Sequence, residues 1–338
     1  MRASAVTLSR FSLSPTLANP TRSRHAPSAS LFTPKCYDGG TGNRRLSHSA
    51  RLRGAAATGD DPRIRKLDKE IIDEYALLRE HYATPNHPIV LAHGLLGFDS
   101  LQLPGPSYLP SIPPIHYWRG IREALSSHCG VEVITASVPP SGTIEQRAAK
   151  LAADISAQAA GKSVNIIAHS MGGLDARYMI SQLAGPAGVD VKSLVTVATP
   201  HHGSAFADYL IDEIGPSYLP RLYDMWERTT GWEPGAFAQL TRRYMDEEFN
   251  EKVKDREGVR YFSYGAMVRG RPPLFSPFRM SHKVLKRLEG PNDGLVSVES
   301  SKWGVYKGTL VGVNHLDLIN WSNRLRFTWR RWMGYKQS

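Results

Sequence analysis

Ser170 has the sequence setting of a reactive serine. It follows the apolar run 164–168, and small residues stand two positions before and after it, Ala168 and Gly172. A strand that turns sharply into a helix holds a serine in a strained conformation with its hydroxyl exposed, and this turn needs small residues at both positions. The usual signature is Gly-x-Ser-x-Gly, from which Ala168 departs by a single methyl group. The pattern therefore predicts such a turn at Ser170, with an ordinary turn serine as the alternative.

A nucleophilic serine needs partners elsewhere in the chain. Its hydroxyl is nearly inert at neutral pH, so it requires a histidine base and an acid that orients the histidine. In sheets of this type the chain order is Ser, acid, His, each on a loop at the carboxyl end of a strand. Asp293 lies in the turn-forming run 291–296, and His315 directly follows the last apolar run. A single Asp or His in a loop is commonly just solvated, but this order and setting predict a triad of Ser170, Asp293 and His315.

Acyl transfer also needs amide donors for the oxyanion, one after the nucleophile and one on a loop after an early strand. Met171 follows Ser170 and supplies the first amide. The run His93–Gly97 follows the first core strand, and its glycines allow close approach of the backbone to a ligand. The Leu95 amide is therefore predicted as the second donor. This chemistry requires no cofactor and no metal ion, and none is expected.

Other titratable residues near strand ends are weaker candidates. Adjacent side chains diverge, so His169 does not easily reach Ser170, and Asp317 is too close along the chain to orient His315. Asp175 lies in the helix after Ser170 and is interpreted as a capping or packing residue. Three further histidines on strand-end loops could line the site, but each precedes the acid in the sequence: His93, His201 and His202.

The elements that must position these residues alternate between strands and helices. This rhythm is typical of a mostly parallel sheet covered by helices on both faces, in which ligands bind beyond the carboxyl ends of the strands. Ser170 falls at such an end. The predicted strands are 89–92, 131–136, 164–168, 191–198, 259–266 and 309–313, and the predicted helices are 117–127, 143–160, 174–183, 281–289 and 317–332.

Two segments depart from this rhythm. Apolar residues recur at helical spacing between Ile64 and Tyr82, which predicts an amphipathic helix that packs on the domain. Residues 203–250 mix aromatic and apolar residues with charges, and an insertion of this kind after a sheet strand is where a lid sits. Additional packing helices are the alternative interpretation. Three glycines are candidate hinges of a lid: Gly215, Gly231 and Gly235.

The positive charge of the chain is concentrated at one end. The net charge is +11 over 338 residues, from 42 basic and 31 acidic residues, and residues 1–59 contain nine of the basic residues but only one acid, Asp38. The remainder is close to balance, which removes the main argument for a nucleic-acid partner. Residues 1–59 are rich in Ser, Ala, Arg, Thr and Pro without a continuous apolar core, and they resemble a mitochondrial transit peptide removed between residues 44 and 59.

A chloroplast transit segment and a disordered basic tail are the alternatives for residues 1–59. Secretion is disfavoured, because Cys36 and Cys129 are the only cysteines and one of them lies in the segment to be removed. No run of about 18 apolar residues occurs, so no membrane span is predicted.

Five motifs in order indicate a family: Pro88–Asp99, Ala168–Gly173, Thr199–Ser204, Asn292–Val296 and Asn314–Asp317. Over residues 88–322 the chain resembles the pseudomonad-type triacylglycerol lipases and their fungal mitochondrial relatives. The resemblance implies an α/β-hydrolase fold with a mobile lid, so that residues 60–338 form the catalytic domain. It also implies the same triad and the same oxyanion amides, acting on an acylglycerol at a lipid–water interface, with peripheral contact to the lipid surface.

The chain departs from that family in two respects. Bacterial members hold a structural calcium ion with two aspartates; Asp317 matches the second, but no clear match for the first occurs in residues 269–291, so no metal is predicted. The disulfide that many of those members carry cannot form here. Phospholipases, acyltransferases and short-chain esterases use the same catalytic parts and are alternatives, as is a non-catalytic lipid-binding protein with this fold.

Overall fold

The computed structural model of the chain describes eight stretches: residues 70–72, 84–95, 100–101, 115–128, 130–140, 142–212, 235–274 and 276–320. All of them belong to one compact unit. The segment predicted to be a transit peptide, residues 1–59, lies outside the described residues.

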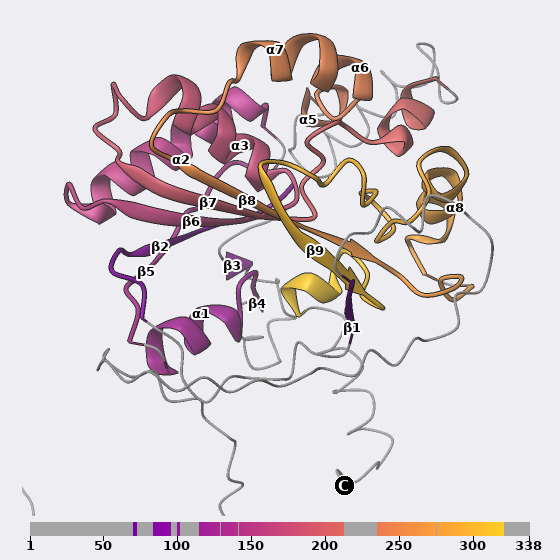
Figure 1. Cartoon of the computed structure of the whole chain (residues 1–338), viewed down its shortest axis with the longest axis horizontal. Coiled ribbons are helices and arrows are strands. Elements are labelled where there is room, and N and C mark those ends of the chain that lie inside the picture. Colours follow the sequence, from indigo (N-terminus) through magenta and orange to yellow (C-terminus); the bar gives the residue numbers. More distant parts are fainter. Residues whose placement is uncertain are drawn as a thin grey trace, which may run out of the picture. The chain divides into compact units, whose positions relative to one another are not determined.

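A parallel sheet of seven strands forms the centre of this unit (Figure 1). The strand order is β1-β9-β8-β7-β6-β2-β5, and every neighbouring pair is parallel. All carboxyl ends therefore lie at the same edge of the sheet, where ligands bind in folds of this kind. The strands are β1 (Glu70–Ile72), β2 (Ile89–Ala92), β5 (Val133–Thr135), β6 (Val164–His169), β7 (Val191–Val197), β8 (Arg260–Met267) and β9 (Val305–Val311), and a separate antiparallel pair is formed by β3 (Ser100–Leu101) and β4 (Ile115–His116).

The longest described helix, α2 (Ile144–Ala159), shows how the local sequence sets the boundaries of an element. Thr143 caps its first turn: the side chains of Thr143 and Gln146 each accept a hydrogen bond from the backbone N–H of the other. The helix ends where Ala160 adopts a left-handed conformation. The other described helices are α1 (Ile121–Glu123), η3 (Ala124–His128), α3 (Gly172–Tyr178), η4 (Met179–Leu183), a helix over 205–212, α5 (Gly235–Ala238), α6 (Arg242–Tyr244), η5 (Met245–Phe249), α7 (Asn250–Lys252), α8 (Arg279–Leu288) and η6 (Asp317–Ile319).

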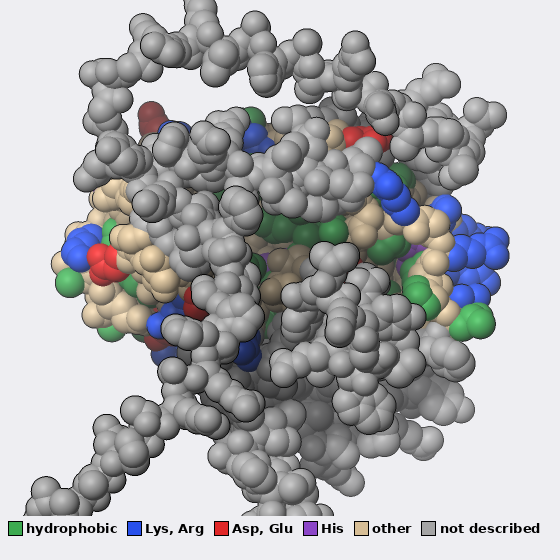
Figure 2. Space-filling model, turned by 90° about the horizontal axis from the view of Figure 1, so that it is seen from below, with side chains coloured by type: hydrophobic (Ala, Val, Ile, Leu, Met, Phe, Trp, Pro, Cys, Tyr) green, Lys and Arg blue, Asp and Glu red, His purple; other side chains and the backbone are tan. Residues whose placement is uncertain are grey.

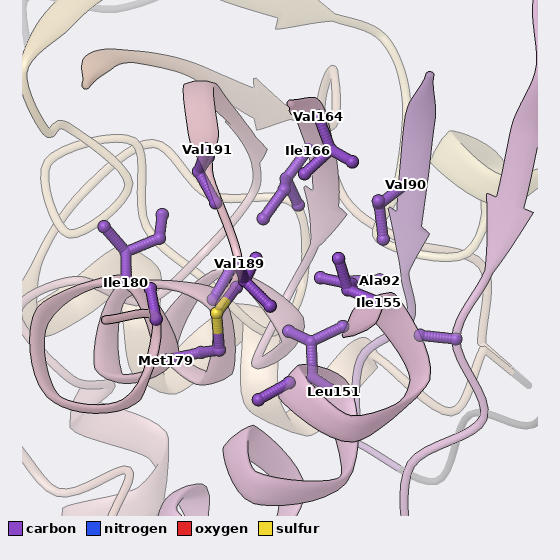
Figure 3. Close-up of a cluster of buried hydrophobic side chains, with 14 of the residues drawn as sticks. Val90, Ala92, Leu151, Ile155, Val164, Ile166, Met179, Ile180, Val189 and Val191 are labelled. Carbon is purple, nitrogen blue, oxygen red and sulfur yellow. The ribbon is translucent and has the colours of Figure 1, made fainter. Parts of the chain in front are cut away.

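The two faces of the sheet carry separate hydrophobic cores. Along β2, Val90 and Ala92 point into a core shared with α2, α3 and η4, which Figure 3 shows in close-up. The alternate residues, Ile89 and Leu91, pack on the other face against η3 and η6. Because a central parallel strand is covered on both faces, all four residues of β2 are buried. The predicted α/β fold with helices on both faces is confirmed, and no described helix is long and apolar enough to cross a membrane.

The predicted helix over residues 64–82 is wrong in its described part. Residues 70–72 form strand β1, in which Ile71 pairs with Leu310 and Ile72 with Val311. The reason is tertiary: without β1, strand β9 would leave its backbone groups unpaired at the edge of the sheet, and β-branched residues suit a strand there. The remaining residues of the predicted helix lie outside the described part of the chain.

The predicted closing helix over 317–332 is also wrong where the structure describes it. Residues 317–319 form the short 3-10 helix η6, and Asn320 ends it with a left-handed conformation, φ 65°. The side-chain oxygen of Asn314 accepts hydrogen bonds from the backbone N–H groups of Leu316 and Asp317, which favours a tight turn over an α-helix. The other predicted strands and helices are present, with ends that differ by up to four residues from the sequence prediction.

Candidate active site

Ser170 lies in a strained turn directly after β6. Its φ of 56° is rare for a residue with a side chain. Hydrogen bonds on both sides hold the turn: the Ser170 N–H donates to the Val197 carbonyl at 3.0 Å, and the Thr199 hydroxyl donates to the Ser170 carbonyl at 2.7 Å. Helix α3 begins two residues later. The predicted sharp strand-to-helix turn therefore exists, and it places Ser170 at the carboxyl edge of the sheet.

The small residues around Ser170 are required by close backbone contacts. A Cβ atom on Gly172 would lie 2.6 Å from the His93 carbonyl oxygen and 2.7 Å from that of Ala92, so no larger residue fits without backbone movement. Ala168, two positions before the serine, is completely buried in β6. Its methyl group belongs to the core on the α2 face, which explains why alanine is accepted in place of the usual glycine.

Gly94 places the first loop of the sheet directly over Ser170. A Cβ atom at Gly94 would lie 2.7 Å from the Ser170 Cβ and 3.2 Å from its hydroxyl oxygen. Leu95, whose amide is predicted as an oxyanion donor, follows immediately. Met171, the other predicted donor, precedes the first turn of α3, where backbone N–H groups have no partner within the helix. Leu95 also packs against the buried cluster that contains Met171.

Asp293 and His315 form a buried, oriented pair. The Asp293 Oδ2 atom lies 2.7 Å from His315 Nδ1, and because a carboxylate can only accept, the proton lies on Nδ1. The other carboxylate oxygen accepts hydrogen bonds from the backbone N–H groups of Leu295 and Val296, both at 2.9 Å. The backbone N–H of His315 also donates to the Asp293 backbone carbonyl at 3.0 Å. These contacts fix both side chains and leave His315 Nε2 as the available base.

Asp317 holds the turn that carries His315, as part of a local contact with Asn314. Its Oδ2 atom accepts a hydrogen bond from the Asn314 N–H at 2.9 Å. The acid that contacts the His315 ring is Asp293, as the sequence predicted. Within the described residues, no group of three or more His, Cys, Asp or Glu side chains is placed to hold a metal ion.

His169 contacts the ring of the predicted base, His315. Its ring centroid lies 4.6 Å from that of His315, and its Nδ1 atom lies 2.7 Å from the Tyr117 hydroxyl oxygen. The same hydroxyl accepts a hydrogen bond from the Gly94 N–H at 3.1 Å. Burial, together with the nearby His315, lowers the pKa of His169 well below its usual value, so the ring is neutral. The sequence does not predict the contact of His169 with His315 or that of Tyr117 with His169, because Tyr117 belongs to no motif and marks only the start of a predicted helix.

A buried ion pair supports the loop that carries Leu95. The Arg147 guanidinium lies 2.8 Å from the Asp175 carboxylate and donates a second hydrogen bond to the His93 carbonyl at 2.9 Å. Burial raises the pKa of Asp175 to about 6, against the opposing effect of Arg147. The interpretation of Asp175 as a packing residue is confirmed. His93 itself accepts a hydrogen bond from the Val138 N–H at 3.3 Å and contacts the Gly94 carbonyl, so it braces this loop.

His201 and His202, which the sequence leaves as weaker candidates to line the site, have other contacts in the structure. His201 is buried beneath β7, where its ring nitrogens contact Thr196 and Arg177 and its ring stacks on Trp303. His202 is exposed and pairs with Asp246 at 3.2 Å. Both histidines follow strand β7, and the structure gives each of them partners other than Asp293 and His315.

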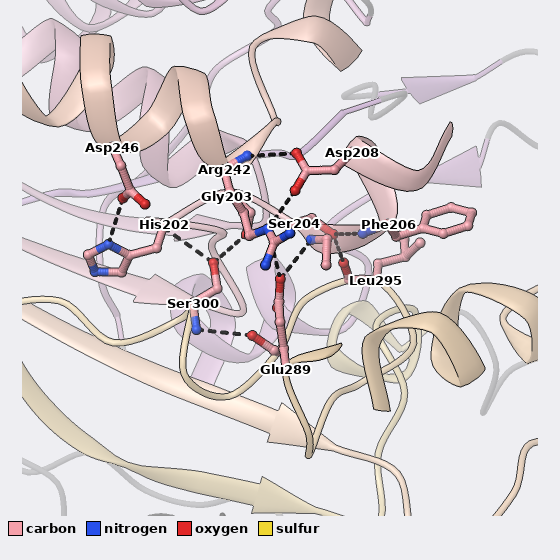
Figure 4. Close-up of polar contacts among 12 residues, drawn as sticks. His202, Gly203, Ser204, Phe206, Asp208, Arg242, Asp246, Glu289, Leu295 and Ser300 are labelled. Atoms are coloured by element: carbon pink, nitrogen blue, oxygen red, sulfur yellow. Dashed lines mark hydrogen bonds and ion pairs between the residues drawn. The ribbon is translucent and has the colours of Figure 1, made fainter. Parts of the chain in front are cut away.

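The two described ends of the predicted insertion are joined to each other and to the acid loop (Figure 4). Arg242 binds the Asp208 carboxylate with both its backbone N–H and its guanidinium. Glu289 accepts a hydrogen bond from the Ala205 N–H at 2.7 Å, and Ser204 donates to the Leu295 carbonyl at 3.0 Å. Residues 213–234, with Gly215 and Gly231, lie outside the described residues, and Gly235 begins α5. The mobile lid over 203–250 stays a prediction.

The fold and this site define the class of protein. A parallel sheet carrying a strained serine after one strand, with a buried Asp and His pair after later strands in the order Ser, Asp, His, is the arrangement of α/β-hydrolases. The mature lipase BlEst2 from Bacillus licheniformis has the same fold: its structure matches 72% of this chain and 91% of its own with a TM-score of 0.52 and 20% identity.

Sequence comparisons give the family. The chain is 36% identical over 300 residues to triacylglycerol lipase 2 of Saccharomyces cerevisiae, which covers 78% of this chain and 89% of the yeast protein. It is 27% identical over 273 residues to a triacylglycerol lipase of Pseudomonas fragi, covering 69% of this chain and 88% of that one. A family model described as a domain of unknown function, DUF7379, matches residues 138–237. The chain belongs to the triacylglycerol lipase family and is a carboxylic ester hydrolase.

Proposed function

We propose that the chain hydrolyses acylglycerol esters with Ser170 as nucleophile, His315 as base and Asp293 as the orienting acid. The observation that carries this assignment is the Asp293–His315 hydrogen bond of 2.7 Å, at the sheet edge where Ser170 occupies its strained turn. A histidine oriented in this way accepts a proton at Nε2, which is the function that a serine nucleophile requires.

In the proposed mechanism, His315 Nε2 takes the proton of the Ser170 hydroxyl as its oxygen attacks the acyl carbonyl carbon. The resulting oxyanion accepts hydrogen bonds from the backbone N–H groups of Leu95 and Met171. His315 then returns the proton to the departing alcohol, which leaves an acyl group on Ser170. A water molecule, deprotonated by His315, attacks this ester and releases the fatty acid. Asp293 stabilises the imidazolium that forms in both half-reactions.

Replacement of the nucleophile tests this assignment. Ser170→Ala is expected to lower turnover on the order of a million-fold, as in other triads, and to abolish covalent labelling by a fluorophosphonate probe. Ser126→Ala, which removes an exposed serine hydroxyl on η3, is the matched control and keeps full activity and labelling. Near-normal ester hydrolysis by the Ser170 variant would exclude Ser170 as the nucleophile.

For the substrate, we propose a long-chain acylglycerol at a lipid surface. The names of the yeast and bacterial relatives support this class, as does the aromatic-rich composition of residues 203–250. Phospholipids, acyl transfer to another acceptor and short soluble esters are the competing substrates for the same site. Rates measured over a series of acyl lengths, with emulsified and dissolved esters, distinguish them. A clear preference for short dissolved esters would exclude the lipase assignment.

For localisation, we propose that residues 1–59 direct the chain to mitochondria. The membrane potential draws positive charge inward at roughly 2.3 kcal/mol per charge per 100 mV, and this segment contains nine basic residues and one acid. A fluorescent reporter fused to residues 1–60 is expected in mitochondria. A reporter that enters chloroplasts supports the alternative transit assignment, and one that stays in the cytosol identifies the segment as a tail.

A further inference from the structure

Exposed apolar side chains are concentrated on one segment of the protein. Within the described residues, four large hydrophobic residues are markedly exposed, and three of them fall between residues 269 and 288: Leu274 at 72%, Met280 at 53% and Leu288 at 50%. Single exposed apolar residues are common on soluble proteins, but their grouping on one short segment marks an interaction surface.

The same segment carries only positive charge. Residues 269–288 contain six Arg or Lys and no Asp or Glu, although residues 60–338 as a whole are close to charge balance. Met280, Lys283 and Arg287 are spaced by three and four residues along α8 and are all exposed, so they share one face of the helix. Figure 2 shows Lys and Arg side chains beside hydrophobic ones at the right-hand edge of the view.

The acid nearest to α8 along the chain does not neutralise the positive charge of this helix face. Glu289 directly follows α8, but its carboxylate accepts a hydrogen bond from the Ala205 N–H at 2.7 Å and lies 3.9 Å from the Arg242 guanidinium. It is therefore engaged at the base of the 205–212 helix. The basic and apolar side chains of Arg271, Leu274, Met280, Lys283, Arg287 and Leu288 are together named the α8 surface below.

The α8 surface is attached to the loop that carries the acid of the triad. Residues 269–288 follow the carboxyl end of β8, so they lie at the same sheet edge as Ser170 and His315. Phe278 packs directly on Gly294, where an added Cβ would lie 2.7 Å from the Phe278 Cβ. The Asn292 side chain donates to the His282 carbonyl at 3.4 Å. A partner bound to the α8 surface therefore meets the edge of the sheet that holds the active site.

We propose that the α8 surface binds the face of an anionic phospholipid bilayer. Such a bilayer satisfies both kinds of side chain at once, because its headgroups attract Lys and Arg while its acyl region accepts Leu and Met. A nucleic acid would leave the apolar side chains without a partner. The proposal rests on the proposed function, because a hydrolase of long-chain acylglycerols must work at a lipid surface. It adds to that function the residues that bind the enzyme to this surface.

Vesicle binding by the full chain carrying Ser170→Ala tests this proposal without lipid hydrolysis. Binding to phosphatidylcholine vesicles is expected to rise when phosphatidylglycerol is included. Lys283→Gln/Arg287→Gln is expected to lower affinity for the anionic vesicles about 30-fold, since each basic residue near such a surface contributes about 1 kcal/mol and 1.4 kcal/mol is tenfold. Arg119→Gln/Arg122→Gln removes two exposed arginines at α1 and is expected to bind like the parent.

Residues 1–59 are basic in every variant, so a second measurement locates the contact. A photoactivatable phosphatidylglycerol is expected to crosslink to peptides within residues 270–288. Crosslinks confined to residues 1–59, unchanged affinity of the α8 double variant, or tighter binding to duplex DNA than to vesicles at equal salt would each overturn the proposal. Hydrolysis of a dissolved short ester is measured in parallel on the α8 variant with Ser170 restored. A normal rate there, with lost vesicle binding, separates this surface from the chemistry of the triad.

Discussion

The Tyr117 hydroxyl lies 2.7 Å from Nδ1 of His169 and accepts a hydrogen bond from the N–H of Gly94, so one phenol joins two sides of the active site. His169 is neutral, because burial and the nearby His315 lower its pKa well below the usual value. The His169 ring lies against that of the proposed base, His315. A neutral ring beside His315 does not repel the imidazolium that forms there during ester cleavage.

Tyr117→Phe is expected to lower kcat about tenfold to a hundredfold with a smaller change in KM. It leaves the Gly94 N–H and His169 Nδ1 without partners, so the loop that presents the Leu95 amide loses its brace, and one oxyanion donor is worth roughly a hundredfold or more. The rate of fluorophosphonate labelling of Ser170 is expected to fall in parallel.

Tyr306→Phe is the matched control for this change. The Tyr306 hydroxyl also accepts a hydrogen bond from a glycine N–H, that of Gly265 at 3.2 Å, and contacts Thr309 at 2.7 Å, and Tyr306 lies within strand β9, before the loop that carries His315. It is expected to lower the free energy of unfolding by about 1–3 kcal/mol, as Tyr117→Phe does, because each leaves a buried donor unpaired. Equal losses of kcat in the two variants would show that Tyr117 acts only through stability.

Gly94→Ala is expected to remove nearly all ester hydrolysis. The new Cβ would lie 2.7 Å from that of Ser170, so the loop at Leu95 must move away and carry its oxyanion amide with it. Gly185→Ala is the control, since nothing lies within 4 Å of a Cβ at that position. It is expected to keep full activity and to gain up to about 1 kcal/mol of stability through a less flexible unfolded chain. Full activity of the Gly94 variant would exclude the assigned position of this loop.

The site residues that the sequence predicts are those with a local signal. The small residues around Ser170, the turn at Asp293 and the histidine after the last strand leave local signals, and the structure brings Asp293 and His315 into contact. Strand β2 has the ends that the sequence predicts, because its four consecutive apolar residues follow Pro88 and precede Gly94 closely, and proline and glycine mark the ends of such runs. Contacts formed between distant segments leave no such signal.

The roles of Tyr117 and His169 therefore escaped sequence analysis. The two residues are 52 positions apart, and only the packing of the segment after β4 on the sheet brings them together. Strand β1 was missed for a related reason, since Ile71 has both helical spacing and a β-branched side chain, and pairing with Leu310 decides between them. The contacts of His201 leave no local signal either, because its ring packs against Arg177 and Trp303, which come from other elements.

Arg147→Met is expected to lower the free energy of unfolding by about 3–5 kcal/mol, because Asp175 remains buried without its partner. Arg147→Met/Asp175→Leu is expected to regain most of this stability, since no charge is left buried. Ester hydrolysis is expected to stay low in both variants, because the hydrogen bond from Arg147 to the His93 carbonyl is lost in each. Denaturant unfolding and kcat measured together provide the test.

Lys162→Met is the control for the ion pair itself. Lys162 pairs with Glu132 at 2.8 Å, but both side chains are about half exposed, and such pairs contribute roughly 0–1 kcal/mol. Normal activity of the Arg147/Asp175 double variant would show that the His93 loop needs no support from this guanidinium.

The stability of the fold is expected to fall as the pH drops below neutral. Burial, together with the nearby Arg147, lowers the pKa of His93 from 6.5 to about 4. Between these values the unfolded chain binds a proton that the folded chain does not, so the free energy of unfolding decreases as pH falls. Burial lowers the pKa of His169 and of His201 in the same direction. Asp175 acts oppositely below about pH 6, because its raised pKa means that the folded state binds the proton first.

His93→Asn tests this dependence directly. Through His93 alone, the free energy of unfolding is expected to be about 2 kcal/mol lower at about pH 5 than at about pH 7, since one pKa unit corresponds to about 1.4 kcal/mol. The variant keeps a polar side chain at that position but no longer titrates, so its loss between the two pH values is expected to be smaller by that amount. His202→Asn makes the same chemical change at an exposed histidine and is expected to leave the loss unchanged. If His93→Asn loses as much stability on acidification as the parent chain, the buried His93 ring is not a group through which the stability responds to pH.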